Sequence, residues 1–350
     1  VDGFKLSEAS YDSVSFSVAS QDGNPRAVKF NNDGTKMYTV GFATDNVYQY
    51  TLSTAYDVST ASYDSVSFSV ASQDSTPLGL TFNADGTKMY ITGNTNDSVF
   101  QYTLSTAFDI STASYDSISL DVSGQDTSPT GITFNNDGTT MYICGATGGE
   151  VNEYALSTAF DLSTASFNAV LSVSSEETAP TGITFNNDGT TMYIVGLSGQ
   201  DINQYTLSTA FDVSTASFDS VTFSVASEDT APTGITFNSD GSKMFVVGQT
   251  NDSVYQYSTG SNFNRMNSTQ LDAVTDPNHY TLGDTLDLAI MLYTDSAGSI
   301  PESDGVSINY DAEALNQGAV VGTDYDYDFP DSTTVRITSN AAQNLKIRVV

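Results

Sequence analysis

Five positions that directly follow prolines are the first candidates for chemistry, because each opens an apolar segment and one of them is charged. They are Arg26, Leu78, Thr130, Thr181 and Thr233, and we expect them near the mouth of a central channel. Arg26 is the single arginine of residues 1–258, so it could bind an anion or pair with Asp22. The threonines repeat one residue type in equivalent places, whereas an active site needs different side chains in different roles. This repetition predicts that the chain is not an enzyme.

Metal ligation is the second chemistry that the residues offer. Asp324, Asp326 and Asp328 alternate with tyrosines, and on a strand this period places the three carboxylates on one face. A cation such as Ca²⁺ would relieve their repulsion, while the alternative is a solvated strand face. We expect at most this weak Ca²⁺ site and no other cofactor.

Two unique residues fit structural roles better than catalytic ones. His279 is the only histidine, stands close to Pro277 and has no recognisable partner base, so we expect it in a loop. Cys144 is the only cysteine and cannot form an intrachain disulfide. It takes the place of Val40 and Val195 in other repeats, which predicts a core position.

The charge balance excludes two classes of partner. The chain has 350 residues, 10 Lys and Arg against 42 Asp and Glu, and a net charge of −32. Such a field repels nucleic acid and anionic bilayers, and the longest apolar run, Leu288 to Tyr293, is too short to cross a membrane. A 39% hydrophobic content still allows packed cores. Residue 1 is Val with no signal-peptide pattern, so we expect a processed product, a fragment or an incomplete reading of a longer chain.

A repeat of about 52 residues must position these side chains. Each of its five copies contains a proline, an apolar strand, a turn of the form F-N-x-D-G, a strand with Met and a Tyr-rich strand. Asp-Gly between apolar runs is a strong hairpin signal, and one Asn and one Asp are too few to bind Ca²⁺. We therefore interpret the Asp-Gly pairs as structural turns, at Asp33, Gly34, Asp85, Gly86, Asp137, Gly138, Asp188, Gly189, Asp240 and Gly241.

The strand pattern of one repeat predicts a propeller blade. Leu78 to Phe82 and Lys88 to Thr92 are apolar on both faces, while Tyr63 to Val70 alternates apolar residues with serine. A four-stranded blade packed between neighbours is expected to have inner strands buried on both faces and an outer strand exposed to solvent on one face. Ser10 to Ser20 is an outer-type strand without preceding partners, and the last repeat stops after its third strand. We therefore predict an all-β, five-bladed propeller over residues 1–258, closed by the N-terminal strand.

The rest of the chain has a different character. Residues 259–275 form an expected linker, and residues 276–350 contain short strand-like runs, which predict a small β-sandwich that could be incomplete at its C-terminus. The runs include Thr285 to Tyr293 and Thr333 to Thr338. The last strand, carrying Leu345, Ile347 and Val349, could join subunits by strand addition.

Three phrases resemble known families. The motif P-x-G-I-T-F-N-x-D-G-x-x-M-Y-x-x-G resembles the Asp-Gly blade signature of lactonase-type and NHL-type propellers, and it implies a propeller. The rim phrase L-S-T-A-[FY]-D-[VI]-S-T-A-S-[YF]-D-S resembles repeats in virion appendage proteins of marine tailed phages and in secreted proteins of marine bacteria. Residues 319–325 resemble part of Calx-β and other immunoglobulin-like modules. Lactonase-type enzymes bind Ca²⁺ through blade-specific carboxylates and amides, and the repeats show no such departure.

These resemblances and the repetition lead to a functional expectation. We expect a non-enzymatic structural or adhesive protein exposed on a virion, as a component of a tail or head fibre. The alternative is a secreted bacterial or archaeal cell-surface adhesin or filament subunit, and a lactonase-type enzyme is the third possibility. The expected partners are copies of the chain, other structural subunits, or a host-surface glycan or protein. The location would be extracellular, where salt screens the acidic surface.

Overall fold

The computed structural model describes residues 3–259, 285–288, 325–331 and 334–339. The first range belongs to one compact unit, Gly3–Gly260. Its helices are short 3-10 turns: η1 (Leu6–Glu8), η2 (Val58–Thr60), η3 (Ile110–Thr112), η4 (Leu162–Thr164) and η5 (Val213–Thr215). Among the described residues, no helix is long and apolar enough to cross a membrane.

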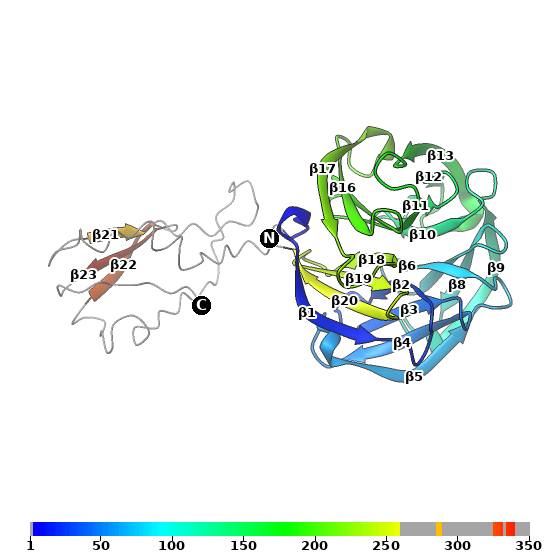
Figure 1. Cartoon of the computed structure of the whole chain (residues 1–350), viewed down its shortest axis with the longest axis horizontal. Helices are drawn as coiled ribbons and strands as arrows, with labels where there is room; N and C mark the ends of the chain where they lie inside the picture. Colours follow the sequence, from blue (N-terminus) through cyan, green and yellow to red (C-terminus); the bar gives the residue numbers. More distant parts are fainter. Residues whose placement is uncertain (1–2, 260–284, 289–324, 332–333, 340–350) are drawn as a thin grey trace. The chain divides into compact units, whose positions relative to one another are not determined.

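The unit is the predicted five-bladed propeller, and each blade is an antiparallel sheet of four strands (Figure 1). The first blade is β2 (Pro25–Phe30), β3 (Lys36–Gly41), β4 (Asn46–Leu52) and β5 (Ala61–Ser69). The second is β6 (Pro77–Phe82), β7 (Lys88–Gly93), β8 (Ser98–Leu104) and β9 (Ala113–Asp121). The third is β10 (Pro129–Phe134), β11 (Thr140–Gly145), β12 (Glu150–Leu156) and β13 (Ala165–Ser172). The fourth is β14 (Pro180–Phe185), β15 (Thr191–Gly196), β16 (Asp201–Leu207) and β17 (Ala216–Ser224).

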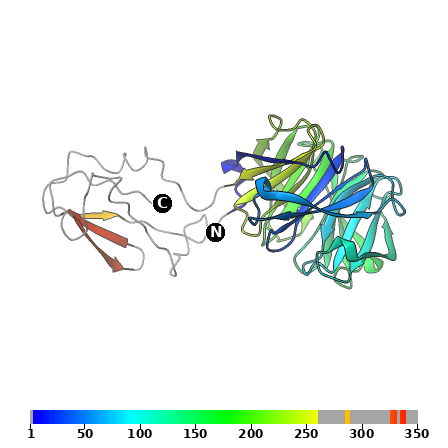
Figure 2. The same cartoon turned by 90° about the horizontal axis from the view of Figure 1, so that it is seen from below.

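The fifth blade joins the two ends of the propeller sequence. It consists of β18 (Pro232–Phe237), β19 (Lys243–Gly248), β20 (Ser253–Ser258) and the N-terminal strand β1 (Ser10–Ser17). β1 pairs antiparallel with β20, with Tyr11 opposite Tyr257 and Phe16 opposite Val254, and Figure 2 shows the same ring from a second direction. The predicted closure by the N-terminal strand is therefore confirmed, and it removes a free sheet edge.

The Asp-Gly turns join the first and second strands of each blade. In the first blade, Asp33 Oδ1 accepts hydrogen bonds from Thr35 N at 2.9 Å and Thr35 Oγ1 at 2.6 Å, and these bonds lower the pKa of the carboxyl. Gly34 has a φ of +71°, a conformation that glycine adopts at little cost. The Tyr56 ring packs against the Cα of Gly34, so a side chain at this position would clash with it.

Apolar side chains between the blades form the core. A tyrosine on the second strand of four blades is buried and donates its hydroxyl to a carbonyl of the following blade. Tyr38 bonds Phe108 O at 2.5 Å and Tyr90 bonds Phe160 O at 2.6 Å. The last link of this series runs from Tyr193 to Phe4 O, so the N-terminal segment continues the repeat. Cys144 is fully buried as expected, and its burial raises the thiol pKa to about 11.

A separate three-stranded antiparallel sheet has the order β21 (Thr285–Leu288), β23 (Thr334–Ser339) and β22 (Tyr325–Asp331). Two of the predicted strand runs thus contain strands. Asp326 and Asp328 lie on β22, opposite Thr338 and Arg336 of β23. Several predictions fall outside the described residues: Asp324 of the metal site, His279, the linker, and the assembly strand with Leu345, Ile347 and Val349. The sandwich and its immunoglobulin-like resemblance stay predictions.

Candidate functional site at the ends of the inner strands

The inner strands β2, β6, β10, β14 and β18 have two ends that differ in chemistry. We call the end at which they begin, with Pro25 and its equivalents, the proline end. The opposite end, at which they run into the Asp-Gly turns, is the turn end. Adjacent inner strands approach closely: a side chain at Gly234 would meet the carbonyl of Arg26 at 2.9 Å. Equivalent positions of neighbouring blades therefore lie near one another around the ring.

At the proline end, the predicted threonines link the blades. Thr130, Thr181 and Thr233 are buried. Their hydroxyls donate to the carbonyl of the proline in the next blade, at 2.8 Å to Pro180, 3.0 Å to Pro232 and 3.0 Å to Pro25. These bonds make the threonines structural. Leu78 at the same position is half-buried and has no hydroxyl with which to form this link.

Arg26 does not form the ion pair with Asp22 that the sequence left open. The Asp22 carboxylate accepts instead from Asn24 N at 2.7 Å, Thr44 N at 3.1 Å and Thr44 Oγ1 at 2.6 Å. The Arg26 guanidinium lies over the Phe42 ring, 4.6 Å from its centre. Burial lowers the pKa of Arg26 to about 10, although the nearby Asp22 charge opposes this shift. Arg26 is thus cationic at neutral pH and forms no salt bridge with a described residue.

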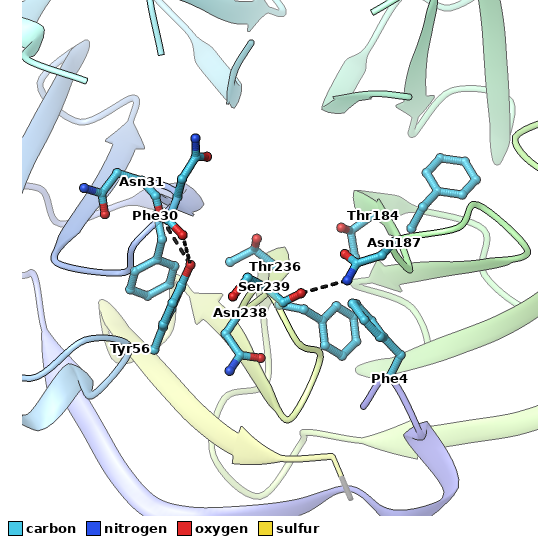
Figure 3. A pocket seen from close by; sticks show the side chains of 12 residues that line it. Phe4, Phe30, Asn31, Tyr56, Thr184, Asn187, Thr236, Asn238 and Ser239 are labelled. Atoms are coloured by element: carbon cyan, nitrogen blue, oxygen red, sulfur yellow. Dashed lines mark hydrogen bonds between the residues drawn. The ribbon is translucent and has the colours of Figure 1, made fainter. Parts of the chain in front are cut away.

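A pocket of about 360 Å³ opens at the turn end. Its walls carry the aromatic rings of Phe4, Phe30 and Tyr56, with the threonines Thr184 and Thr236 on the inner strands (Figure 3). Asparagines complete the rim, and some of them link blades: Asn187 Nδ2 donates to Ser239 O at 2.7 Å and Asn32 Nδ2 to Ala84 O at 2.8 Å. The pocket therefore combines aromatic side chains with a surface that is mainly polar.

Lys29 breaks the repeat beside this pocket. It occupies on β2 the position that Thr81, Thr133, Thr184 and Thr236 occupy on the other inner strands. Thr184 and Thr236 line the pocket, as do Phe30 and Asn31, whereas Lys29 itself is not a lining residue. The equivalence with the two threonines places Lys29 at the same level of the ring, directly before Phe30 in the chain. Its ammonium makes no hydrogen bond or salt bridge within residues 3–259. The lysines Lys36, Lys88 and Lys243, in contrast, each have a partner.

Burial lowers the pKa of Lys29 to about 8. Desolvation is the cause, because a charged ammonium loses hydration when protein surrounds it. The side chain keeps an intermediate accessible surface, as expected of a group enclosed by protein but still reached by water. An amine with this pKa is partly neutral near pH 8 and can act as a base.

The sequence reasoning missed Lys29 because the F-N-x-D-G phrase begins one residue later. Aligning the inner strands instead of the turns exposes the difference, since the residue before each phenylalanine is Thr in four repeats and Lys in one. The predicted channel-mouth residues all belong to the proline end, and none of them lines the pocket. The turn aspartates bond within their own turns, as in Asp85 with Thr87 and Asp137 with Thr139.

The described residues contain no cluster of three or more His, Cys, Asp or Glu side chains able to hold a metal ion. Beside the pocket the repeat places a lysine instead of carboxylates. We therefore derive no step through a metal.

Solved structures similar to this chain include proteins with lactonase names. A putative 6-phosphogluconolactonase from Bacteroides uniformis is 14% identical, with a TM-score of 0.44 and coverage of 66% of this chain and 65% of that one. A putative 6-phosphogluconolactonase from Bacteroides fragilis is 15% identical, with a TM-score of 0.41 and coverage of 57% and 55%. The periplasmic gluconolactonase PpgL of Pseudomonas aeruginosa is 16% identical, with a TM-score of 0.38 and coverage of 55% and 52%. The chain spans less than two thirds of these structures, and no curated protein matches it.

The match to a protein family is more informative than these structures. The family described as "Lactonase, 7-bladed beta-propeller" matches residues 18–210. This finding overturns two expectations from the sequence, namely that the chain is not an enzyme and that it is a structural or adhesive virion protein. Both treated the repetition of the blades as evidence against chemistry, and the virion expectation also rested on the resemblance of the rim phrase to phage appendage repeats, which the comparisons do not show. Since the match covers more than half of the chain, the protein belongs to the lactonase β-propeller family, and residues 3–259 form five blades where the family description has seven.

Proposed function

We propose that the protein hydrolyses a small hydroxylated lactone in the pocket at the turn end, with Lys29 as the general base. Membership of the lactonase family supports this reaction class. The pocket volume of about 360 Å³ falls in the range of small-molecule sites. The observation that carries the proposal is Lys29 itself, an amine with no hydrogen-bond or salt-bridge partner in residues 3–259, whose pKa is lowered to about 8.

The chemistry needs a base and a donor to the carbonyl oxygen. Neutral Lys29 takes a proton from a water molecule while the water oxygen attacks the lactone carbonyl carbon. The hydroxyls of Thr184 and Thr236 line the pocket, form no hydrogen bond with another described side chain, and can donate to the developing oxyanion. The ring C–O bond then breaks, and the Lys29 ammonium returns its proton to the leaving alkoxide. The product is a hydroxy acid.

The pocket walls indicate the substrate class. Phe4, Phe30 and Tyr56 offer flat apolar faces, which suit the C–H face of a sugar-like ring. The asparagine rim offers amide groups to ring hydroxyls. A small lactone with hydroxyl substituents matches both, whereas a long acyl chain would leave the polar rim unpaired.

The test is hydrolysis of glucono-δ-lactone by the purified chain, followed by titration of the released acid at constant pH. Lys29→Thr gives the first blade the residue of the other four, so the fold should tolerate it. We expect this variant to lose about 10²- to 10⁴-fold in kcat/KM, as removal of a general base does. The wild-type rate should rise with pH and level off above an apparent pKa of about 8.

Leu78→Thr is the matched control, because it also installs the threonine found in other blades, at the proline end and outside the pocket, and should leave turnover unchanged. Circular dichroism verifies that both variants are folded. A Lys29→Thr variant with wild-type kcat/KM, or a wild-type protein with no turnover above buffer, would overturn the proposal.

A further inference from the structure

The proline end holds a second group of unusual side chains, in three neighbouring blades. Arg26 follows Pro25, Asn24 precedes it, and Phe42 follows Gly41, which lies opposite Pro25 in the sheet. Asn94 and Gln249 take the place of Phe42 in the second and fifth blades, following Gly93 and Gly248. We call these five residues the proline-end cluster.

The blades bring the cluster together. The fifth blade is tied to the first by the hydrogen bond from Thr233 Oγ1 to Pro25 O, at 3.0 Å. Backbone hydrogen bonds fix the two amide residues at the same level: Asn94 N donates to Thr76 O at 3.0 Å and Gln249 N to Ala231 O at 3.1 Å. The cluster thus spans the fifth, first and second blades on one side of the ring.

Four polar atoms of the cluster are buried without a hydrogen-bond partner. They are Arg26 Nε, Asn24 Oδ1, Asn94 Oδ1 and Gln249 Oε1. Buried polar atoms are nearly always paired in folded proteins, because each unpaired one costs free energy. Only nine side-chain atoms of this kind occur among the described residues, and four of them gather here. Ordered water or a bound polar ligand can supply the missing partners.

The third and fourth blades lack this chemistry. At the positions of Phe42 and its equivalents they carry Ala146 and Leu197, and at the position of Arg26 they carry threonines bonded to the next blade. The fold therefore does not require the polar cluster, since the same backbone forms with small or apolar residues. Its presence in the fifth, first and second blades alone indicates that these residues bind a ligand.

We infer that the proline-end cluster binds a small hydroxylated carboxylate. The Arg26 guanidinium offers N–H donors to a carboxylate, and the Phe42 ring 4.6 Å away holds its plane in place. The nearby acid, Asp22, already accepts from Asn24 N, Thr44 N and Thr44 Oγ1, so its oxygens do not occupy Arg26. The amides of Asn24, Asn94 and Gln249 accept from or donate to hydroxyls. This site is separate from the pocket at the turn end, and binding there does not depend on turnover.

Calorimetric titration with sodium gluconate tests the inference, because gluconate carries one carboxylate and several hydroxyls. Wild-type protein should bind it, and Arg26→Thr, which installs the residue of three other blades, should weaken binding at least tenfold. Asn94→Ala, which copies Ala146, should weaken gluconate binding more than acetate binding. Lys29→Thr should bind gluconate as the wild type does.

Three results would overturn the inference. The first is the absence of gluconate binding to wild-type protein. The second is unchanged binding by both Arg26→Thr and Asn94→Ala. The third is loss of binding in Lys29→Thr instead, which would place the carboxylate at the turn end. If Arg26→Thr does not fold, Asn94→Ala and Gln249→Ala decide the question alone, and thermal unfolding shows which variants are intact.

Discussion

Lys29 is a lysine whose ammonium forms no salt bridge with any carboxylate of residues 3–259. Its pKa falls from an ordinary value of 10.5 to about 8 on folding. Between these values the unfolded chain holds a proton that the folded chain does not, so folding is penalised wherever the unfolded lysine is charged. This loss of folding stability has its full size below pH 8, where Lys29 is charged in both states, and it disappears as the pH rises to about 10.5.

Lys29→Thr should therefore stabilise the protein at neutral pH. We expect the free energy of unfolding to rise by about 1–3 kcal/mol at pH 7, and the gain to vanish near pH 10.5. Urea unfolding at both pH values measures it, with Lys5→Thr as a surface control that should change stability by less than about 0.5 kcal/mol. A gain of equal size at both pH values would show that charge is not its cause. A residue that costs stability while serving a site is a common trade-off.

Glu153 and Asn168 form the same amide–carboxylate hydrogen bond as a pair in the other blades, but with the amide and the carboxylate on opposite strands. In those blades a glutamine on the third strand donates to an aspartate on the fourth, as Gln101 Nε2 does to Asp116 Oδ2 at 2.9 Å. In the third blade Asn168 Nδ2 donates to Glu153 Oε1 at 2.6 Å. The other oxygen of Glu153 accepts from Val213 N at 3.1 Å. Donor and acceptor have changed places together, so the hydrogen bond survives.

A double-mutant cycle on this pair should show strong coupling. Asn168→Asp places two carboxylates in contact and should cost about 2–4 kcal/mol, and Glu153→Gln should cost about 1–2 kcal/mol. The double variant recreates the pair of the other blades and should return to within about 1 kcal/mol of wild type. Urea unfolding of the four proteins gives the coupling energy. Additive losses would mean that the two side chains do not act as a pair.

The Asp-Gly turn is the element that sets the hairpin of every blade. Gly138 has a φ of +73°, and a side chain there would fall on the ring of Phe160. Both features require glycine, whereas Gly124 has open space around it and no positive φ.

Gly138→Ala should therefore lower the free energy of unfolding by about 2–4 kcal/mol, through backbone strain and displacement of the Phe160 ring. Gly124→Ala, in the exposed turn between β9 and β10, should change it by less than about 0.5 kcal/mol. Thermal unfolding monitored by circular dichroism compares them. Equal losses for the two variants would contradict the steric explanation.

The elements that depend on signals within one repeat could be predicted from the sequence. Features that depend on contacts between repeats could not. The Asp-Gly pairs, the alternation of Tyr63 to Val70 and the unpaired N-terminal strand are readable within one repeat, and they predicted the blades and their closure. Arg26 was recognised because it is the only arginine of its region. The cluster of Asn24, Asn94 and Gln249 comes from three different repeats, and each residue alone is an ordinary loop residue. Its grouping follows only from the packing of inner strands around the ring.

At the scale of the whole molecule, the hydrogen bonds of one N-terminal strand hold the ring closed. Asp12 on β1 accepts from Gln256 Nε2 at 2.8 Å and Ser258 Oγ at 2.7 Å on β20. Asp116 on β9 accepts equivalent bonds from Gln101 and Thr103 of β8. The chain runs directly from β8 through η3 into β9 of the same blade, whereas β1 joins the fifth blade through its pairing with β20 and is followed in the chain by the first blade.

Asp12→Ala should therefore loosen the ring more than Asp116→Ala, although both remove similar hydrogen bonds. We expect faster amide hydrogen exchange throughout β1 and β20 in Asp12→Ala. In Asp116→Ala, we expect a change limited to the neighbourhood of residue 116. Exchange measured by mass spectrometry resolves the two regions. Equal protection of β1 in both variants would show that closure does not depend on Asp12.

The join between β1 and β20 also has a consequence during protein synthesis. The pocket takes Phe4 from the start of the chain, Phe30 from the first blade, and Thr236 and Phe237 from the last. A ribosome that has made four blades has therefore made only part of the pocket, because Thr236 and Phe237 are still missing. A chain that lacks the fifth blade, or in which β1 has not paired with β20, would contain Lys29 without the complete pocket. Binding of the substrate is therefore expected only after the fifth blade has formed. Ligand binding could thus report, molecule by molecule, that assembly has finished.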